Sequence, residues 1–204
     1  MLITEYLFTS EREGKLKKQD IIHDIQAEMV EYFKNVRERS RKEATKTLMK
    51  KVDKTLDKYI TKSNLHQCIS CKKGCSACCS TRVTITEDEG LLIKDYIEKH
   101  NIEYDLVKID RLRNLDSDGW NSIPVEERKC AFLDNNGACK IYPVRPTTCR
   151  KLMVTSDSQQ CRHKLNTFNI DRVLDYKSEI LVSAIWQVSK TGNLPDIMYP
   201  LLNK

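Results

Sequence analysis

The sequence predicts a mainly α-helical protein with a helical N-terminal region, a small loop-rich cysteine domain and a C-terminal helix. Two observations predict this fold class. Apolar residues recur every three or four positions in both end regions, and five cysteines crowd into the twelve residues 68–79. The expected boundaries are 1–63 for a basic helical region, 64–164 for the cysteine domain and 165–204 for the C-terminal helix packed on it.

The N-terminal region contains two amphipathic runs without proline or glycine. Residues at helical spacing form two stripes, Ile22, Ile25, Met29, Phe33, Val36 and Leu48, Val52, Leu56, Tyr59. This spacing places each stripe on one face of a helix. The sequence therefore predicts two helices, or one long helix with a break between Arg39 and Lys42.

The same region is strongly basic. From Lys34 to Lys62 there are eleven Lys or Arg and four acids, a local net charge of +7, whereas the whole chain carries +6. Clustered positive charge favours contact with phosphates, which makes nucleic acid one candidate partner. The alternative is a solvated face on which Asp53 and Asp57 pair with neighbouring lysines. We favour the solvated face, because aromatic residues that would stack on bases do not interleave the basic ones.

Beyond Asn64 the pattern changes to short segments. Residues 82–86 alternate apolar and polar side chains as a strand does. Thr86, with Glu89 three residues later, has the form of a capping box and predicts a helix that runs to about His100. Residues 113–129 are expected to form a loop-rich connection.

The C-terminal region predicts one helix. Asn169 is its expected N-cap, and Gly192 is expected to end it. Its apolar stripe consists of Val173, Leu174, Ile180, Leu181, Ala184, Ile185 and Val188. A stripe of this kind packs against a core, so we expect no cofactor role for it.

The composition excludes several classes of protein. The six glycines are too far apart for a glycine-rich phosphate loop. No run approaches 18 consecutive apolar residues, and the N-terminus lacks the basic-then-apolar order of a secretory signal. We therefore expect a cytoplasmic protein without a membrane partner.

The nine cysteines are the unusual feature. An odd number of thiols in a reducing compartment favours metal chelation over disulfides. The first cluster has thiols two to four residues apart, a spacing that can converge on one soft cation, and it comprises Cys68, Cys71, Cys75, Cys78 and Cys79. Because adjacent Cys78 and Cys79 start in different directions, they do not easily share one tetrahedral zinc.

Four more cysteines follow at wide spacings. Cys130 and Cys139 flank the turn signal at 135–137, so we expect them near each other on a hairpin. Prolines stiffen the segment before Cys149, and Cys161 is the last cysteine. His66 and His163 lie two residues from a cysteine and are further candidate ligands.

These segments together resemble a known family. The run C-x-x-C-C at 75–79, then V-x-I-T-x-x-E, then C-x-F-L-D, then G-x-C-x-I-Y-x-x-R-P-x-x-C-R, is similar to the YkgJ-type cysteine cluster family of zinc- or iron-chelating domains. The resemblance spans about Cys71 to Cys161. In that family the opening is C-x-x-C-x-x-C-C, and here Cys71 stands one residue farther from Cys75. Cys68 lies outside the pattern.

The resemblance implies a metal-bound cysteine domain. The thiols expected to hold the metal are Cys71, Cys75, Cys78, Cys79, Cys130, Cys139, Cys149 and Cys161. Both zinc and an iron–sulfur cluster suit such ligands, and Arg145 and Arg150 flank Cys149 as candidate cofactor-binding residues. For both arginines the alternative role is a structural ion pair with an acid such as Asp134.

Three functions follow from the sequence. The first is a metal-binding protein with a structural or binding role, whose partners are metal ions and a protein partner or substrate. The second is an iron–sulfur-dependent protein-modifying enzyme, because relatives in the resembled family include the flagellin lysine N-methylase type. The third is a nucleic-acid-binding metalloprotein that uses the basic helices. The spacing assigns no catalytic residue, so enzymatic activity stays an open question.

Overall fold

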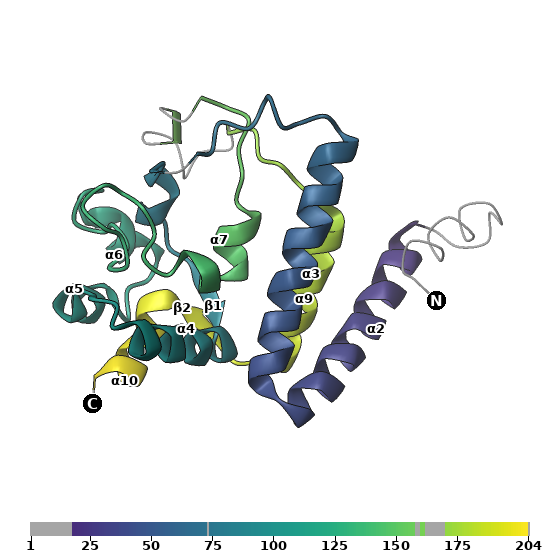
Figure 1. Ribbon diagram of the computed structural model, residues 1–204, viewed down its shortest axis with the longest axis horizontal. Coiled ribbons are helices and arrows are strands. Elements are labelled where there is room, and N and C mark those ends of the chain that lie inside the picture. The colour runs from purple at the N-terminus through teal and green to yellow at the C-terminus, as the bar shows by residue number, and fades with distance from the viewer. Residues whose placement is uncertain (1–17, 73, 158–159, 162–169, 204) are drawn as a thin grey trace.

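The computed structural model describes residues 18–72, 74–157, 160–161 and 170–203, and side chains from residue 22 onward. The fold is mainly α-helical, as predicted, with one small two-stranded sheet in this part of the chain. Figure 1 shows two groups of elements. Long helices stand on one side, and shorter helices with the sheet lie on the other.

The N-terminal region forms two helices, α2 (Lys18–Arg39) and α3 (Arg41–Lys62). The predicted break between them is confirmed. Ser40 separates the helices and caps α3, because its hydroxyl accepts the backbone N–H of Glu43 at 3.2 Å.

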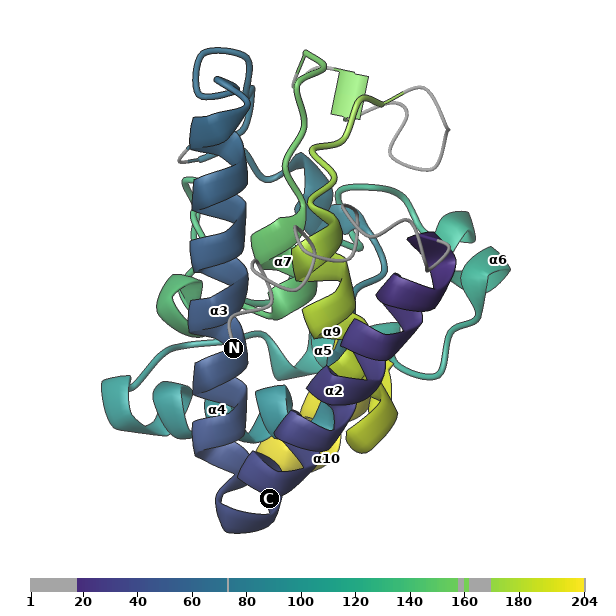
Figure 2. The ribbon, with the colours of Figure 1, turned by 90° about the vertical axis from the view of Figure 1, so that its right-hand side faces the viewer.

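Helix α9 (Tyr176–Val188) packs against both α2 and α3 (Figure 2). The three helices bury a common apolar core of Phe33, Leu48, Val52, Leu56, Leu181, Val182, Ala184 and Ile185. Both predicted N-terminal stripes and the C-terminal stripe contribute to it. The predicted cap Asn169 lies outside the described residues, and α9 begins after Asp175, whose carboxylate accepts the N–H groups of Lys177 and Ser178.

The second group is built around β1 (Thr84–Thr86) and α4 (Glu87–His100). The expected strand at 82–86 is shorter than predicted, and the capping box formed by Thr86 and Glu89 is present. Asn101 ends α4 in the left-handed conformation.

The C-terminus differs from the single predicted helix. Gly192 lies in β2 (Thr191–Asn193), which pairs antiparallel with β1 so that Ile85 is opposite Gly192. A second helix, α10 (Leu194–Leu202), then begins with Pro195 in its first turn, where a missing N–H costs nothing. The chain after α9 therefore turns back into the second group.

Helices α4, α5 (Leu106–Leu112) and α10 enclose a second core. It contains Ile85, Ile93, Ile97, Ile109, Ala131, Phe132, Ile141, Leu194, Ile197 and Met198. The stretch at 113–129, expected to be loop-rich, also contains the short helix α6 (Ser117–Ser122). Trp120 of α6 is buried and donates to the carbonyl of Ser80 at 3.1 Å.

Charged pairs join the two groups of elements. Buried Asp88 of α4 accepts from Arg37 at 2.5 Å and from Arg41, and Arg41 also reaches Glu87 at 2.7 Å. Acids of α4 thus neutralise part of the positive charge of the basic helices. Asp53 pairs with Arg150, from which it accepts at 2.6 Å, and not with the neighbouring lysines that were expected.

The described residues also include three short helical segments: η1 (Ala77–Ser80), η2 (Tyr142–Val144) and α7 (Thr147–Lys151). Helix α7 packs on α3 and lies between the two groups in Figure 1. Within the described residues, none of the helices has the length and apolar character needed to cross a membrane.

Candidate metal centre

All nine cysteines lie in the described part of the chain, and all nine thiols are free. They come from separate segments around η1, the turn at 135–137, α7 and residue 161. Cys68 and Cys71 are exposed, Cys161 is buried, and the other six are partly buried. No disulfide forms among them.

Segment η1 presents Cys78 and Cys79. Its turn is closed by backbone bonds from Cys79 N to the carbonyl of Ser76 at 3.0 Å and from Thr81 N to that of Cys78 at 3.2 Å. The interaction with the adjacent Cys79 thiol lowers the pKa of Cys78 to about 7, and the nearby Arg145 charge acts in the same direction. The same interaction raises the pKa of Cys79.

The predicted hairpin carries Cys130 and Cys139. An isolated antiparallel bridge joins Leu133 to Cys139, and Gly137 takes a positive φ of 76° in the turn. Cys130 N donates to the carbonyl of Cys79 at 2.8 Å, which fixes the hairpin directly to η1. Burial raises the pKa of Cys130 to about 11, and the charge of Cys139 adds to this effect.

Helix α7 carries Cys149. Burial raises its pKa well above the ordinary thiol value, with further contributions from the charges of Cys130 and Cys78. The charges of Cys130 and Cys149 contribute in turn to the raised pKa of Cys79. The thiols of η1, the hairpin and α7 therefore lie close enough to act on one another.

A second group of thiols consists of Cys161, Cys71 and Cys75, whose charges act on one another. Cys161 packs with Val154 and Ile170 in a small buried cluster that Ala77 covers. Burial raises the pKa of Cys161, and the charges of Cys71 and Cys75 add to it. The charge of Cys78 raises the pKa of Cys149 and also that of Cys161.

The described side chains do not yet form a closed coordination shell. Among them, no three His, Cys, Asp or Glu residues are arranged as a group that could hold a metal ion. The donor set nevertheless fits a soft cation, because it consists of reduced thiols from several segments. Loading with metal would have to draw these thiols closer together.

The two predicted cofactor-binding arginines have different surroundings. The Arg145 guanidinium lies over the Tyr142 ring at 4.2 Å, and its charge partly offsets the burial that raises the pKa of Cys139. Its Nε is buried without a hydrogen-bond partner among the described atoms. Arg145 thus faces the thiols, where its charge can balance thiolate charge.

Arg150 is buried and faces the backbone. It donates to the carbonyl of Arg145 at 2.9 Å, to that of Pro143 at 2.5 Å and to Asp53 at 2.6 Å. The acid that pairs with it is Asp53, not Asp134. Asp134 instead accepts backbone N–H groups within its own turn.

The histidines add little to the thiol set. His66 is hydrogen-bonded to the hydroxyl of Thr61 at 3.2 Å, and His100 stacks on Tyr96 with ring centroids 4.3 Å apart. His163 lies outside the described residues.

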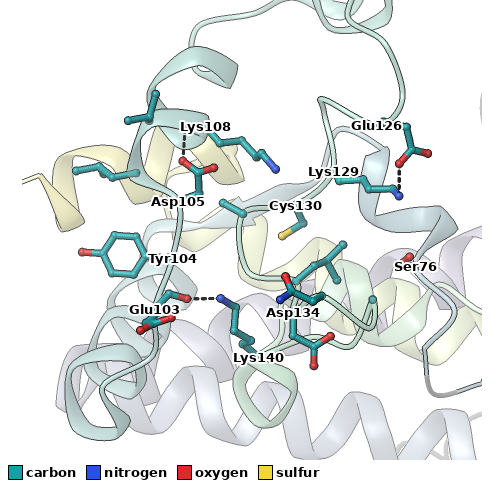
Figure 3. A pocket seen from close by; sticks show the side chains of 16 residues that line it. Ser76, Glu103, Tyr104, Asp105, Lys108, Glu126, Lys129, Cys130, Asp134 and Lys140 are labelled. Carbon is teal, nitrogen blue, oxygen red and sulfur yellow. Dashed lines mark hydrogen bonds and ion pairs between the residues drawn. The ribbon is translucent and has the colours of Figure 1, made fainter.

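A pocket of about 710 Å³ opens beside the thiols, between the start of α5 and the hairpin. Cys130 is the thiol among its lining residues, and Figure 3 shows Lys108, Lys129 and Lys140 around it. Lys140 donates to the carbonyl of Glu103 at 2.6 Å. The pocket gives solvent a route to Cys130, a feature that no sequence motif signalled.

Sequence reasoning also missed the role of Glu89. The capping-box pattern identified this residue only as part of a helix start. In the structure its carboxylate also reaches Thr147, the first residue of the helix that carries Cys149. The T-x-x-E motif at Thr86–Glu89, inside the resembled pattern, was the available signal.

Comparison with known proteins gives one match. Residues 70–169 match the model of the family CxxCxxCC, described as a putative zinc- or iron-chelating domain. The match begins after Cys68 and includes the other eight cysteines. The searches of curated proteins and of solved structures found no match.

Proposed function

We propose that this protein binds metal through its clustered thiols and uses it as a structural core, because residues 70–169 match the model of a family described as zinc- or iron-chelating. The proposed ligands are the eight cysteines inside the match: Cys71, Cys75, Cys78, Cys79, Cys130, Cys139, Cys149 and Cys161. Both zinc and an iron–sulfur cluster fit this donor set.

The observation that supports the proposal most is that the segment matching the chelating family carries eight free thiols, drawn from separate parts of the fold. Thiolates are the form that binds metal, and the lowered pKa of Cys78 makes it the thiol most readily deprotonated near neutral pH. Arg145 supplies a positive charge that offsets part of the negative charge of assembled thiolates. Bound metal would neutralise the rest and link the segments.

The structural role follows from how little else holds some of these segments. The cluster of Val154, Cys161 and Ile170 is the small apolar core on the side of Cys71 and Cys75. Structural zinc contributes about 10–16 kcal/mol in small domains. Energy on that scale can order loops that have no large hydrophobic core. Reduced thiol ligands also suit a reducing compartment, so we place the protein in the cytoplasm.

Element analysis of anaerobically purified protein tests this function. We expect bound zinc, or iron with acid-labile sulfide and visible absorption, to remain through gel filtration. Cys149→Ser should lose metal, because Cys149 is partly buried and the charges of Cys130, Cys78 and Cys139 act on it. Cys68→Ser is the matched control, since Cys68 is exposed and precedes the family match.

A wild-type protein without metal would contradict the proposal, as would equal metal content in wild type and Cys149→Ser. No observation on the described residues favours the methylase or nucleic-acid alternatives over metal binding.

A further inference from the structure

Glu89 is a buried carboxylate that connects two parts of the chain. Its side chain is 0 % exposed. One oxygen, Oε2, accepts from the backbone N–H of Thr86 at 2.8 Å and from the Thr86 hydroxyl at 3.2 Å. The other, Oε1, accepts from the backbone N–H of Thr147 at 2.7 Å and from the Thr147 hydroxyl at 2.8 Å. All four donors belong to two threonines that lie 61 positions apart in the sequence.

The capping box of α4 needs only half of this arrangement. A capping box requires one carboxylate oxygen to accept the N-cap N–H, which Oε2 does for Thr86. Burying a carboxylate is costly unless its oxygens are hydrogen-bonded. The second oxygen is satisfied by α7 alone, so the position of α7 and the burial of Glu89 depend on each other.

Helix α7 cannot hold its own position. It has five residues, far fewer than an isolated helix needs for stability in water. Contacts from outside fix it instead. Glu89 holds Thr147, the carbonyl of Thr84 accepts from the hydroxyl of Thr148 at 2.8 Å, and Arg150 bonds to carbonyls and Asp53. Cys149 lies between these anchored residues.

We propose that Glu89 is a positioning residue for the metal centre: by holding Thr147 it sets where α7 places the Cys149 thiol. The inference rests on the proposed metal-binding function. Groups that hold a metal ligand in place, without touching the metal, commonly change affinity 10–100-fold when they are removed. Glu89 would act in this way through one turn of backbone.

The neighbouring Asp88 offers a matched control. It lies on the same helix and is also buried, with a side chain that is 0 % exposed. Its partners, however, are Arg37 and Arg41, which join α4 to the long helices. Asp88→Asn should therefore lower the stability of the protein without moving Cys149.

The experiment compares metal loss from Glu89→Gln, Thr147→Val and Asp88→Asn in the full chain, purified anaerobically with its own zinc or iron. The rate of transfer to an excess of chelator is measured without denaturant, and urea unfolding gives the stability of each variant. The glutamine amide nitrogen donates hydrogen bonds, so it cannot accept the N–H of both Thr86 and Thr147. We expect metal loss at least 10-fold faster for Glu89→Gln and several-fold faster for Thr147→Val. Asp88→Asn should lose metal at the wild-type rate.

Each outcome either supports or overturns the positioning role of Glu89. Equal metal-loss rates in Glu89→Gln and wild type would overturn the inference, as would the same acceleration in Asp88→Asn at matched stability. If Glu89→Gln does not fold, Thr147→Val decides, because it removes one hydroxyl and keeps the side-chain shape. A wild-type protein that holds no metal would overturn the proposed function itself and this inference with it. Metal in wild type with unchanged variants overturns the inference alone.

Discussion

Two regions of the molecule differ in how much apolar surface they bury: the helices α2, α3 and α9, and the thiol segments around η1. The helices bury eight apolar residues in a common core, several of them fully inaccessible, such as Phe33 and Leu48. On the side of Cys71 and Cys75 the apolar cluster contains three buried residues, and one of these is Cys161. This difference indicates that hydrophobic burial can fold the layer of α2, α3 and α9, whereas the thiol segments need another source of free energy.

The hairpin lies between these extremes. Phe132 is buried in the core of α4, α5 and α10, and Cys130 and Cys139 pack against the same core. Two of the proposed ligands are thus held in place without metal. The segments carrying Cys71, Cys75 and Cys161 should depend on metal more strongly than the hairpin does.

The largest expected effect of a mutation is in the helical core. Phe33→Ala removes a fully buried ring and should lower the free energy of unfolding by about 3–5 kcal/mol. Urea unfolding followed by circular dichroism measures it, with Tyr32→Ala as the partly exposed control. Because the core contains no thiol, the loss should be the same before and after metal removal. A loss that appears only in the metal-bound protein would show that the two regions are not independent.

An intermediate effect is expected in the turn that faces the first cysteine cluster. Gly137 has a φ of 76°, and a Cβ there would lie 3.1 Å from the Ser76 hydroxyl and 3.2 Å from the Gly74 carbonyl oxygen. Gly137→Ala should cost about 1–3 kcal/mol of unfolding free energy and speed metal loss to a chelator. Asn136→Ala, at an exposed neighbouring position, is the control. Unchanged metal retention in Gly137→Ala would mean that this contact does not shape the centre.

The smallest effect concerns the link between the two regions. Asp53→Asn keeps an acceptor for Arg150 but removes the charge, and Asp53 is half exposed, so the expected cost is about 1 kcal/mol. Asp57→Asn, one turn later on the same exposed face, should cost less. Thermal unfolding of both variants makes the comparison. Equal melting temperatures would show that the Asp53–Arg150 pair contributes nothing measurable to the stability of the contact between α3 and α7.

Local features of this fold could be predicted from the sequence. Helical spacing located α2 and α3, the capping pattern located the start of α4, and Asn135–Gly137 located the hairpin turn. Each signal lies within a few residues of the structure that it predicts. The C-terminus was predicted as one helix, because the return through β2 depends on pairing with β1 more than 100 residues earlier.

For the candidate site, the sequence predicts thiol ligands but not their setting. The cysteine spacing and the family resemblance both indicate metal binding. The Glu89–Thr147 bond, the pairing of Arg150 with Asp53 and the pocket beside Cys130 each join distant residues. Contacts of that kind follow from packing, which spacing along the chain does not encode.

Amide hydrogen exchange with and without bound metal tests the central claim most directly. It is measured on anaerobically purified full-length protein before and after metal removal by a strong chelator under reducing conditions. The account predicts that removal speeds exchange around Cys71–Cys79, α7 and Val154, while α3 and α9 keep their protection. Unchanged exchange around the cysteines, or equal loss of protection in α3 and α9, would contradict it.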